Sequence, residues 1–345
     1  MILLELSKKD TKMIQGLSIL AMVCLHLFDK SYTGLFQPLI FIKGIPLSFY
    51  FAQLADFCVF GFAFCSGYAH MMLFGQNNYY KKRLKSLLVL MINFWIVLIV
   101  FTITSVCIGQ ASFMPGSVWD FLGTAFLYDM HYNGAWWYLW AYALLVIISP
   151  LILKAIQRIN CVVILIIGII IYCTAFYVRF YIRTDNYLLV HFGPFGMTLF
   201  EYMLGCAAFK IKLFTKLFHV WARVPFVLRL IGSITIFLFL LLGRSLIAPN
   251  VFAAPISGFI IISLFVLIKK SKWIENMFLF FGKHSTNIWL THMFFCSVLF
   301  TNFVYLAKYP IFIFLLTLLI TITISILIKL IEKPLVNIIC NGSKR

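Results

Sequence analysis

Charged residues are scarce in this 345-residue chain: they make up 11% of the sequence, and only 10 of them are acidic. Soluble globular domains carry about a quarter charged residues, so this scarcity excludes a water-soluble enzyme. The sequence instead has 63% apolar residues and a mean hydropathy of +1.03. This composition is typical of a chain whose side chains face lipid or pack against other lipid-embedded helices.

Other signals are missing as well. No basic run is longer than residues 81–83, so the net charge of +18 does not indicate a nucleic-acid partner and is better explained by basic cytoplasmic loops. The nine cysteines include no CxxC pair and no metal-ligand spacing, so the sequence predicts no metal site. No Ser-, Pro- or Gly-rich linker divides the chain, which predicts a single domain over residues 1–345.

Long apolar runs occupy most of the sequence. Ten of them are long enough to cross roughly 30 Å of hydrocarbon as helices, and only short loops separate them. The expected fold is therefore an all-α, polytopic bundle of ten transmembrane spans. The predicted spans are residues 12–29, 46–74, 86–110, 136–157, 161–178, 194–212, 226–243, 252–268, 284–306 and 310–331.

The basic residues predict the orientation of these spans. With ten spans, 22 Lys and Arg residues fall on the side of the N-terminus and 6 on the other side. Positively charged loops face the cytoplasm. The sequence therefore predicts that both termini are cytoplasmic.

Ionisable side chains at membrane depth are few, and each costs about 2.5–3.5 kcal/mol at a span centre for Asp, Lys or Arg. From a rise of about 1.5 Å per residue, His26 lies in the outer half of span 1, and Asp56 and Glu201 lie about 15 and 10 Å below the outer surface. If these three side chains meet in one layer of the membrane, a carboxylate would orient the His26 imidazole as a general base. Alternatively, His26 makes a purely structural interhelical contact.

The first span carries three polar side chains on one face. At 100° per residue, Gln15 is about 20° from His26 around the helix axis, and Lys12 is about 40° to the other side. Such a face can line a path between a cytoplasmic ligand and a site in the membrane. Alternatively, Lys12 extends to the lipid headgroups.

Several motifs resemble acyltransferase family 3. Residues 12–26 are similar to the opening helix of the family, in which a basic residue precedes a Gly and a His follows about ten residues later. The Phe-rich segment 58–68, ending in Ser-Gly-Tyr, and the basic segment 80–85 also fit. Residues 137–139, Pro150 and residues 284–292 fall where the family pattern expects them. The sequence departs at Gln15, where the family has a basic residue, and Lys12 is a candidate substitute.

The resemblance implies that the chain transfers an acyl group, most often acetyl, from cytoplasmic acyl-CoA to a hydroxyl of an envelope glycan or its lipid-linked precursor. It implies a multi-pass protein of the bacterial cell membrane, with acyl-CoA as co-substrate and no bound cofactor. His26 is expected to act as general base, or to carry the acyl group, with Asp56 or Glu201 orienting it. The residues expected to bind the donor are Lys12, Gln15, Ser66, Lys81, Lys82, Arg83, Lys85 and His292.

The longest outer loop, residues 111–135, suggests where the acceptor binds. It contains His131 and leads into Trp136 and Trp137, whose rings are candidates to stack on sugars. Alternatively, these rings belong to an interfacial aromatic belt. Basic loop residues such as Lys81 and Lys82 likewise have an alternative role as topology signals alone.

Two functions from other classes stay open on the sequence alone. A secondary transporter or lipid-linked glycan translocator would also have many spans and isolated ionisable residues at mid-depth. The lack of a visible internal repeat counts modestly against it. A non-catalytic partner in envelope assembly would make His26 replaceable.

Overall fold

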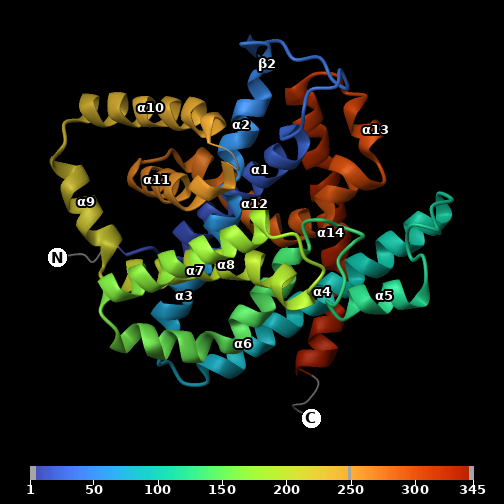
Figure 1. The fold of residues 1–345 in the computed structure, drawn as a ribbon, viewed down its shortest axis with the longest axis horizontal. Coiled ribbons are helices and arrows are strands. Elements are labelled where there is room, and N and C mark those ends of the chain that lie inside the picture. Colours follow the sequence, from blue (N-terminus) through green and yellow to red (C-terminus); the bar gives the residue numbers. More distant parts are fainter. Residues whose placement is uncertain (1–4, 248–249, 342–345) are drawn as a thin grey trace. The chain divides into compact units, whose positions relative to one another are not determined.

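The computed structural model describes residues 5–247 and 250–341, and most of these are helical (Figure 1). A two-residue hairpin, β1 (Phe41–Ile42) and β2 (Ile45–Pro46), follows the first helix. The α-helices are α1 (Lys8–Phe28), α2 (Leu47–Ala55), α3 (Cys58–Leu73), α4 (Tyr79–Cys107), α5 (Val118–Ala125), α6 (Trp137–Arg158), α7 (Cys161–Tyr181), α8 (Tyr187–Lys210), α9 (Leu213–Arg223), α10 (Phe226–Gly243), α11 (Ala254–Leu267), α12 (Lys272–Met293), α13 (Thr301–Tyr305) and α14 (Pro310–Asn341). Three short helices complete the chain: η1 (Arg244–Leu246), η2 (Asn250–Ala253) and the π-helix η3 (Phe294–Val298).

The chain forms two compact units. Unit 1 comprises residues 1–32, 40–76 and 148–283, and unit 2 comprises residues 33–39, 77–147 and 284–345. Helices α6 and α12 each contribute residues to both units. The single functional domain predicted from the sequence stays a prediction.

Among the described residues, seven helical segments are long and apolar enough to cross a membrane. They are Lys8–Phe28, Leu47–Leu73, Tyr79–Cys107, Trp137–Arg158, Cys161–Tyr181, Phe226–Gly243 and Pro310–Ile339. Each coincides with a predicted span. The other predicted spans fall on α8, on α11 and on the region of α12, so the count of ten is not confirmed.

The ninth predicted span is wrong as a continuous helix. Residues 284–306 begin within α12, which ends at Met293, and continue through η3 into the short α13. The apolar run therefore covers the end of one helix and two short ones. Apolar composition alone cannot reveal such an interruption, because the π-helix residues Phe294–Val298 are as apolar as a spanning helix.

Helix α1 begins with a capping box, in which the side chains of Ser7 and Asp10 each bond the other's backbone N–H. The segment before α1 is also held in place. The Glu5 carboxylate accepts hydrogen bonds from the Tyr68 hydroxyl and from the Thr215 hydroxyl, the latter at 2.7 Å. The N-terminal segment is thus bonded to α3 and α9 of unit 1.

Glycines permit close helix packing in unit 1. A Cβ atom on Gly67 of α3 would lie 2.0 Å from the Tyr202 carbonyl oxygen of α8, and one on Gly205 of α8 would lie 2.1 Å from the Phe64 carbonyl oxygen of α3. Helices α7 and α8 also pack side by side (Figure 1). Close backbone approach through small residues is a common means of packing membrane helices.

Unit 2 is held together partly by polar side chains. The Asn93 amide of α4 donates a hydrogen bond to the Asn287 amide oxygen of α12, and His284 Nδ1 lies 2.9 Å from the Ser325 hydroxyl oxygen of α14. These residues are buried, so the hydrogen bonds join polar groups that water does not reach.

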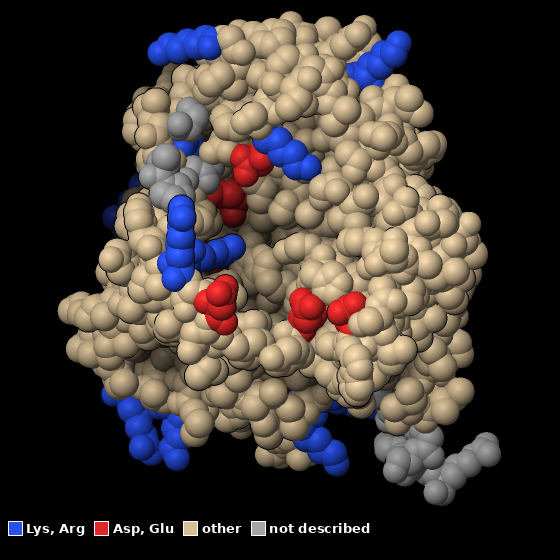
Figure 2. Space-filling view, turned by 45° about the vertical axis from the view of Figure 1, so that its right-hand side comes forward, with Lys and Arg blue, Asp and Glu red and all other residues tan. Residues whose placement is uncertain are grey.

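The surface carries few charges. Figure 2 shows Lys, Arg, Asp and Glu as separate groups on an otherwise uncharged face. Many large apolar side chains are exposed, and in the spanning segment Phe226–Gly243 only 11% of the residues are buried. Soluble monomers rarely expose such contiguous apolar surface. Helix length and surface are together those of a membrane protein.

Candidate functional site

The second spanning segment of unit 1 is interrupted at Asp56. Helix α2 ends at Ala55 and α3 starts at Cys58, so Asp56 lies in a short turn inside Leu47–Leu73. The Asp56 carboxylate accepts a hydrogen bond from the Arg244 guanidinium of η1. Both side chains are less than a tenth exposed. A buried charge of this kind requires a partner, and Arg244 supplies it.

Helix α1 runs antiparallel to α2 and α3, and its register places His26 near this turn. The Cys65 thiol lies 4.0 Å from the Thr11 carbonyl oxygen, and the Asp29 carboxylate at the end of α1 accepts a hydrogen bond from Gln53 of α2. Interpolation between these contacts puts residue 26 level with residues 55–56. This register puts the half-buried His26 at the level of the buried Asp56 in unit 1.

Glu201 is the second buried carboxylate of unit 1. It is 4% exposed, and among the described residues its Oε2 has no hydrogen-bond partner. Glu201 interacts electrostatically with Asp56 and with Arg179 of α7. The three candidate catalytic residues thus lie in one unit. Neither carboxylate hydrogen-bonds the His26 imidazole in the described structure; Asp56 binds Arg244 instead.

Two of the three polar side chains predicted to share a face of the first span are in contact at the start of α1. Lys12 Nζ donates a 3.0 Å hydrogen bond to Gln15 Oε1. The backbone here is closely packed, since a Cβ on Gly282 of α12 would lie 2.1 Å from the Lys12 carbonyl oxygen. Lys12 is therefore fixed to its neighbour on α1.

The predicted donor-binding lysines lie at the start of α4 in unit 2. Lys81, Lys82 and Lys85 are exposed, while Arg83 is half-buried. The N-cap residue Asn78 makes no side-chain capping hydrogen bond. The first backbone N–H groups of a helix point toward its N-terminal end, where these lysines lie. Cationic side chains and a helix N-terminus both favour anions.

Two other predicted donor-binding residues have local hydrogen bonds. Ser66 of α3 donates to the Phe62 carbonyl oxygen at 2.8 Å. His292 is fully buried, and its Nδ1 lies 2.8 Å from the Trp289 carbonyl oxygen one turn earlier in α12. Both contacts are of the kind that polar residues make within a helix.

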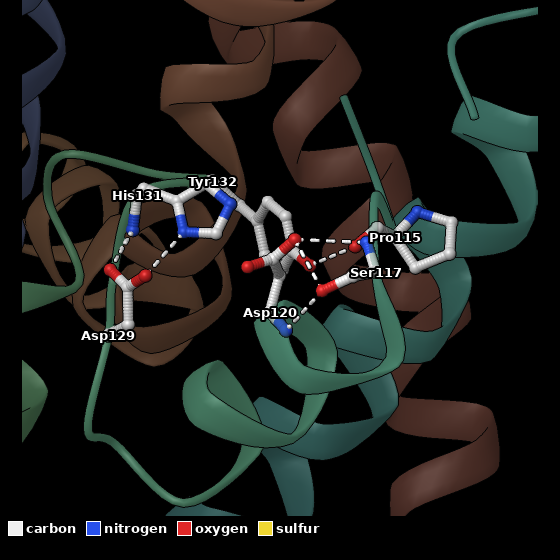
Figure 3. A network of polar contacts seen from close by, with 6 residues as sticks. All are labelled: Pro115, Ser117, Asp120, Asp129, His131 and Tyr132. Atoms are coloured by element: carbon white, nitrogen blue, oxygen red, sulfur yellow. Dashed lines mark hydrogen bonds and ion pairs between the residues drawn. The ribbon is translucent and has the colours of Figure 1, made fainter. Parts of the chain in front are cut away.

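The loop of residues 111–135 in unit 2 contains a network of polar contacts (Figure 3). Asp129 accepts a hydrogen bond from the His131 backbone N–H at 3.1 Å, and one of its carboxylate oxygens lies 2.8 Å from His131 Nδ1. The Tyr132 hydroxyl donates to the Pro115 carbonyl oxygen. Burial raises the pKa of Tyr132 to about 12, so the phenol stays protonated and able to donate at neutral pH.

The same network caps α5. Ser117 and Asp120 form a second capping box, and hydrogen bonds from Ser117 hold the pKa of Asp120 below its ordinary value. His131 is exposed, as an acceptor-binding role requires.

The two tryptophans differ in position. Trp136 is fully buried; its Nε1 donates to the Leu290 carbonyl oxygen at 2.9 Å, and its ring packs edge-on against Phe94. The prediction that Trp136 stacks on a sugar does not fit this position, because the ring is part of the core. Trp137 is half-buried at the start of α6.

Two features of unit 1 are not predicted from the sequence. The first is Arg244, whose side chain is 3% exposed and is paired with Asp56. The second is His70, whose Nδ1 lies 3.0 Å from the Tyr202 hydroxyl oxygen in the core between α3 and α8. Within the described residues, no group of three or more His, Cys, Asp or Glu side chains is arranged to hold a metal ion.

Comparison with known protein families identifies the chain. A sequence model described as an acyltransferase domain, that of acyltransferase family 3, matches residues 12–330. The chain belongs to acyltransferase family 3. Comparisons with curated proteins and with solved structures give no match.

Membership of acyltransferase family 3 confirms the resemblance found in the sequence motifs, and it supports a membrane acyltransferase over a transporter. The matched region extends from α1 into α14 and contains all the residues predicted to form the site.

Proposed function

We propose that this member of acyltransferase family 3 transfers an acyl group, most often acetyl, from cytoplasmic acyl-CoA to a hydroxyl of a surface polysaccharide or its lipid-linked precursor. The observation that supports the proposal is the register of α1 against α2 and α3, which puts His26 level with Asp56 in the unit that also contains the buried Glu201. An imidazole near carboxylates at membrane depth has the chemistry of a general base.

His26 is the proposed base. Its unprotonated ring nitrogen takes the proton of the acceptor hydroxyl while the oxygen attacks the thioester carbonyl carbon. The tetrahedral intermediate collapses by breaking the carbon–sulfur bond, and the thiolate takes the proton from the imidazolium. Asp56 and Glu201 contribute negative charge that stabilises the imidazolium. A variation has His26 itself carry the acyl group before the hydroxyl attacks.

The donor's phosphates are proposed to bind at the start of α4. Lys81, Lys82, Arg83 and Lys85 supply positive charge there, and the first turn adds uncapped N–H groups. Coenzyme A is a polyanion, so this end of α4 suits its phosphates. His131 is the proposed acceptor contact on the outer loop.

The proposed setting is the bacterial cell membrane, with ten spans and both termini in the cytoplasm. The uneven distribution of Lys and Arg supports this topology. It places the basic start of α4 on the side where acyl-CoA is made, and the loop of residues 111–135 on the side of the envelope glycans.

The deciding experiment is His26→Ala, read by the mass of the envelope glycan in cells that depend on this protein. We expect loss of the acyl mass with normal amounts of folded protein in the membrane. His219→Ala is the matched control, because His219 is exposed on α9, away from the proposed site. Normal acylation in the His26 variant would show that the assignment of the base is wrong.

A further inference from the structure

Two buried carboxylate oxygens in unit 1 lack a donor. Asp56 uses Oδ1 to bind Arg244, while its Oδ2 has no hydrogen-bond partner among the described residues, and the same holds for Oε2 of Glu201. An acceptor that is left without a donor in a buried position costs about 1–3 kcal/mol, and more when charged. Each of these atoms therefore requires a hydrogen-bond donor, and the described residues supply none.

The backbone around these atoms is irregular. The turn at Asp56 separates α2 from α3, and α10 gives way to η1 and then η2 before α11 starts. Tyr172 of α7 links this region to η2 by donating to the Val251 carbonyl oxygen at 3.0 Å. Non-helical backbone at membrane depth is tolerated where it is buried in protein or lines a water-filled cavity.

We infer that Asp56 Oδ2 and Glu201 Oε2 form a subsite for the acceptor, accepting hydrogen bonds from two hydroxyl groups of a polyol, and that Arg244 is a positioning residue that fixes Asp56. This inference rests on the proposed function. It assigns the two carboxylates to substrate recognition, beyond their charge effect on His26.

The two free carboxylate oxygens favour hydroxyl groups over other ligands. A carboxylate oxygen only accepts hydrogen bonds, so each free oxygen requires a ligand that donates one. A metal ion would need further ligands, and the described residues offer no group of three or more suitable side chains. Sugar hydroxyls donate readily to carboxylates, and a charged acceptor gives the stronger bond. A polyol therefore matches both free oxygens.

If the two carboxylates bind the acceptor, removing one of them should shift acyl transfer from the glycan to water. Native membranes are supplied with radiolabelled acetyl-CoA, and the label is measured in glycan and in free acetate, the product when water replaces the acceptor. Glu201→Gln keeps the shape of the side chain but removes its charge. We expect the ratio of labelled glycan to acetate to fall at least tenfold. Glu332→Gln, the same change on the half-buried Glu332 of α14, is the control and leaves the ratio as in the wild type.

A second variant guards against misfolding. Asp56→Asn combined with Arg244→Gln removes the ion pair without leaving one charge buried alone, and the same fall in ratio is expected. In the wild-type protein, oligosaccharides released from the acylated glycan should slow labelling of Glu201 by dicyclohexylcarbodiimide at least fivefold, as read by peptide mass.

The outcomes separate this inference from the proposed function. If wild-type membranes label no glycan, the proposed function fails. If they do, an unchanged ratio in folded variants, or carbodiimide labelling of Glu201 that oligosaccharides do not slow, overturns the hydroxyl subsite and leaves His26 as the base. Water would then be the hydrogen-bond donor to the two carboxylate oxygens.

Discussion

The ion pair between Asp56 and Arg244 permits a quantitative test of the fold. Both side chains are nearly inaccessible, 7% and 3% exposed, and each is a charge that burial would otherwise penalise. Removing one partner of a buried pair costs about 3–5 kcal/mol, because the other charge is left uncompensated. At about 2–4 °C per kcal/mol, Arg244→Gln should lower the unfolding temperature by roughly 6–20 °C.

The double variant provides the check on this reasoning. In Asp56→Asn with Arg244→Gln no charge is left alone, so at least about half of the lost stability should return. The assay is thermal unfolding of the purified protein in detergent, followed by tryptophan fluorescence. If Arg244→Gln unfolds within about 2 °C of the wild type, or if the double variant is less stable than either single one, the pair is not a buried charge pair in the folded protein.

Three further predictions concern packing, capping and the donor. Gly67→Ala should lower stability by about 1–3 kcal/mol, because its Cβ would meet the backbone of α8, whereas Gly232→Ala, with no atom within 4 Å, should be neutral or stabilising in the same unfolding assay. Ser117→Ala removes the N-cap of α5 and should speed hydrogen exchange of the first amides of α5 about fivefold. Folding lowers the pKa of Asp120. The stabilisation by its side of the capping box is therefore complete above the ordinary carboxyl pKa of about 3.9 and is lost at more acidic pH. Coenzyme A should raise the unfolding temperature, and Lys82→Ala with Arg83→Ala should remove at least half of that gain; an equal gain in both proteins would place the donor elsewhere.

The sequence predicted the positions of most spanning helices because apolar runs and the length needed to cross lipid are both visible in it. Helix α10 has the bounds of its predicted span, residues 226–243. The sequence also predicts that His26, Asp56 and Glu201 lie in one layer, since depth follows from counting residues along the spans; this stays a prediction.

The interruptions of the spanning helices could not be predicted from the sequence. The turn at Asp56 and the π-helix after Met293 lie in stretches whose composition is as apolar as a helix, so only packing decides them. The burial of Arg244 could not be inferred because its partner is 188 residues away in the chain. Trp136 was misplaced for a similar reason: an aromatic residue at the end of a loop can face lipid headgroups or the core, and contacts with distant residues determine which.

The contacts of Glu5 limit how far this protein can be truncated at its N-terminal end. The family match begins at residue 12, but the cap of α1 is Ser7, and the Glu5 carboxylate is bonded to Tyr68 and Thr215. A truncation designed on the family boundary would therefore remove the helix cap and leave two hydroxyl groups without their acceptor. Expression variants of this chain should keep residue 5 onward intact.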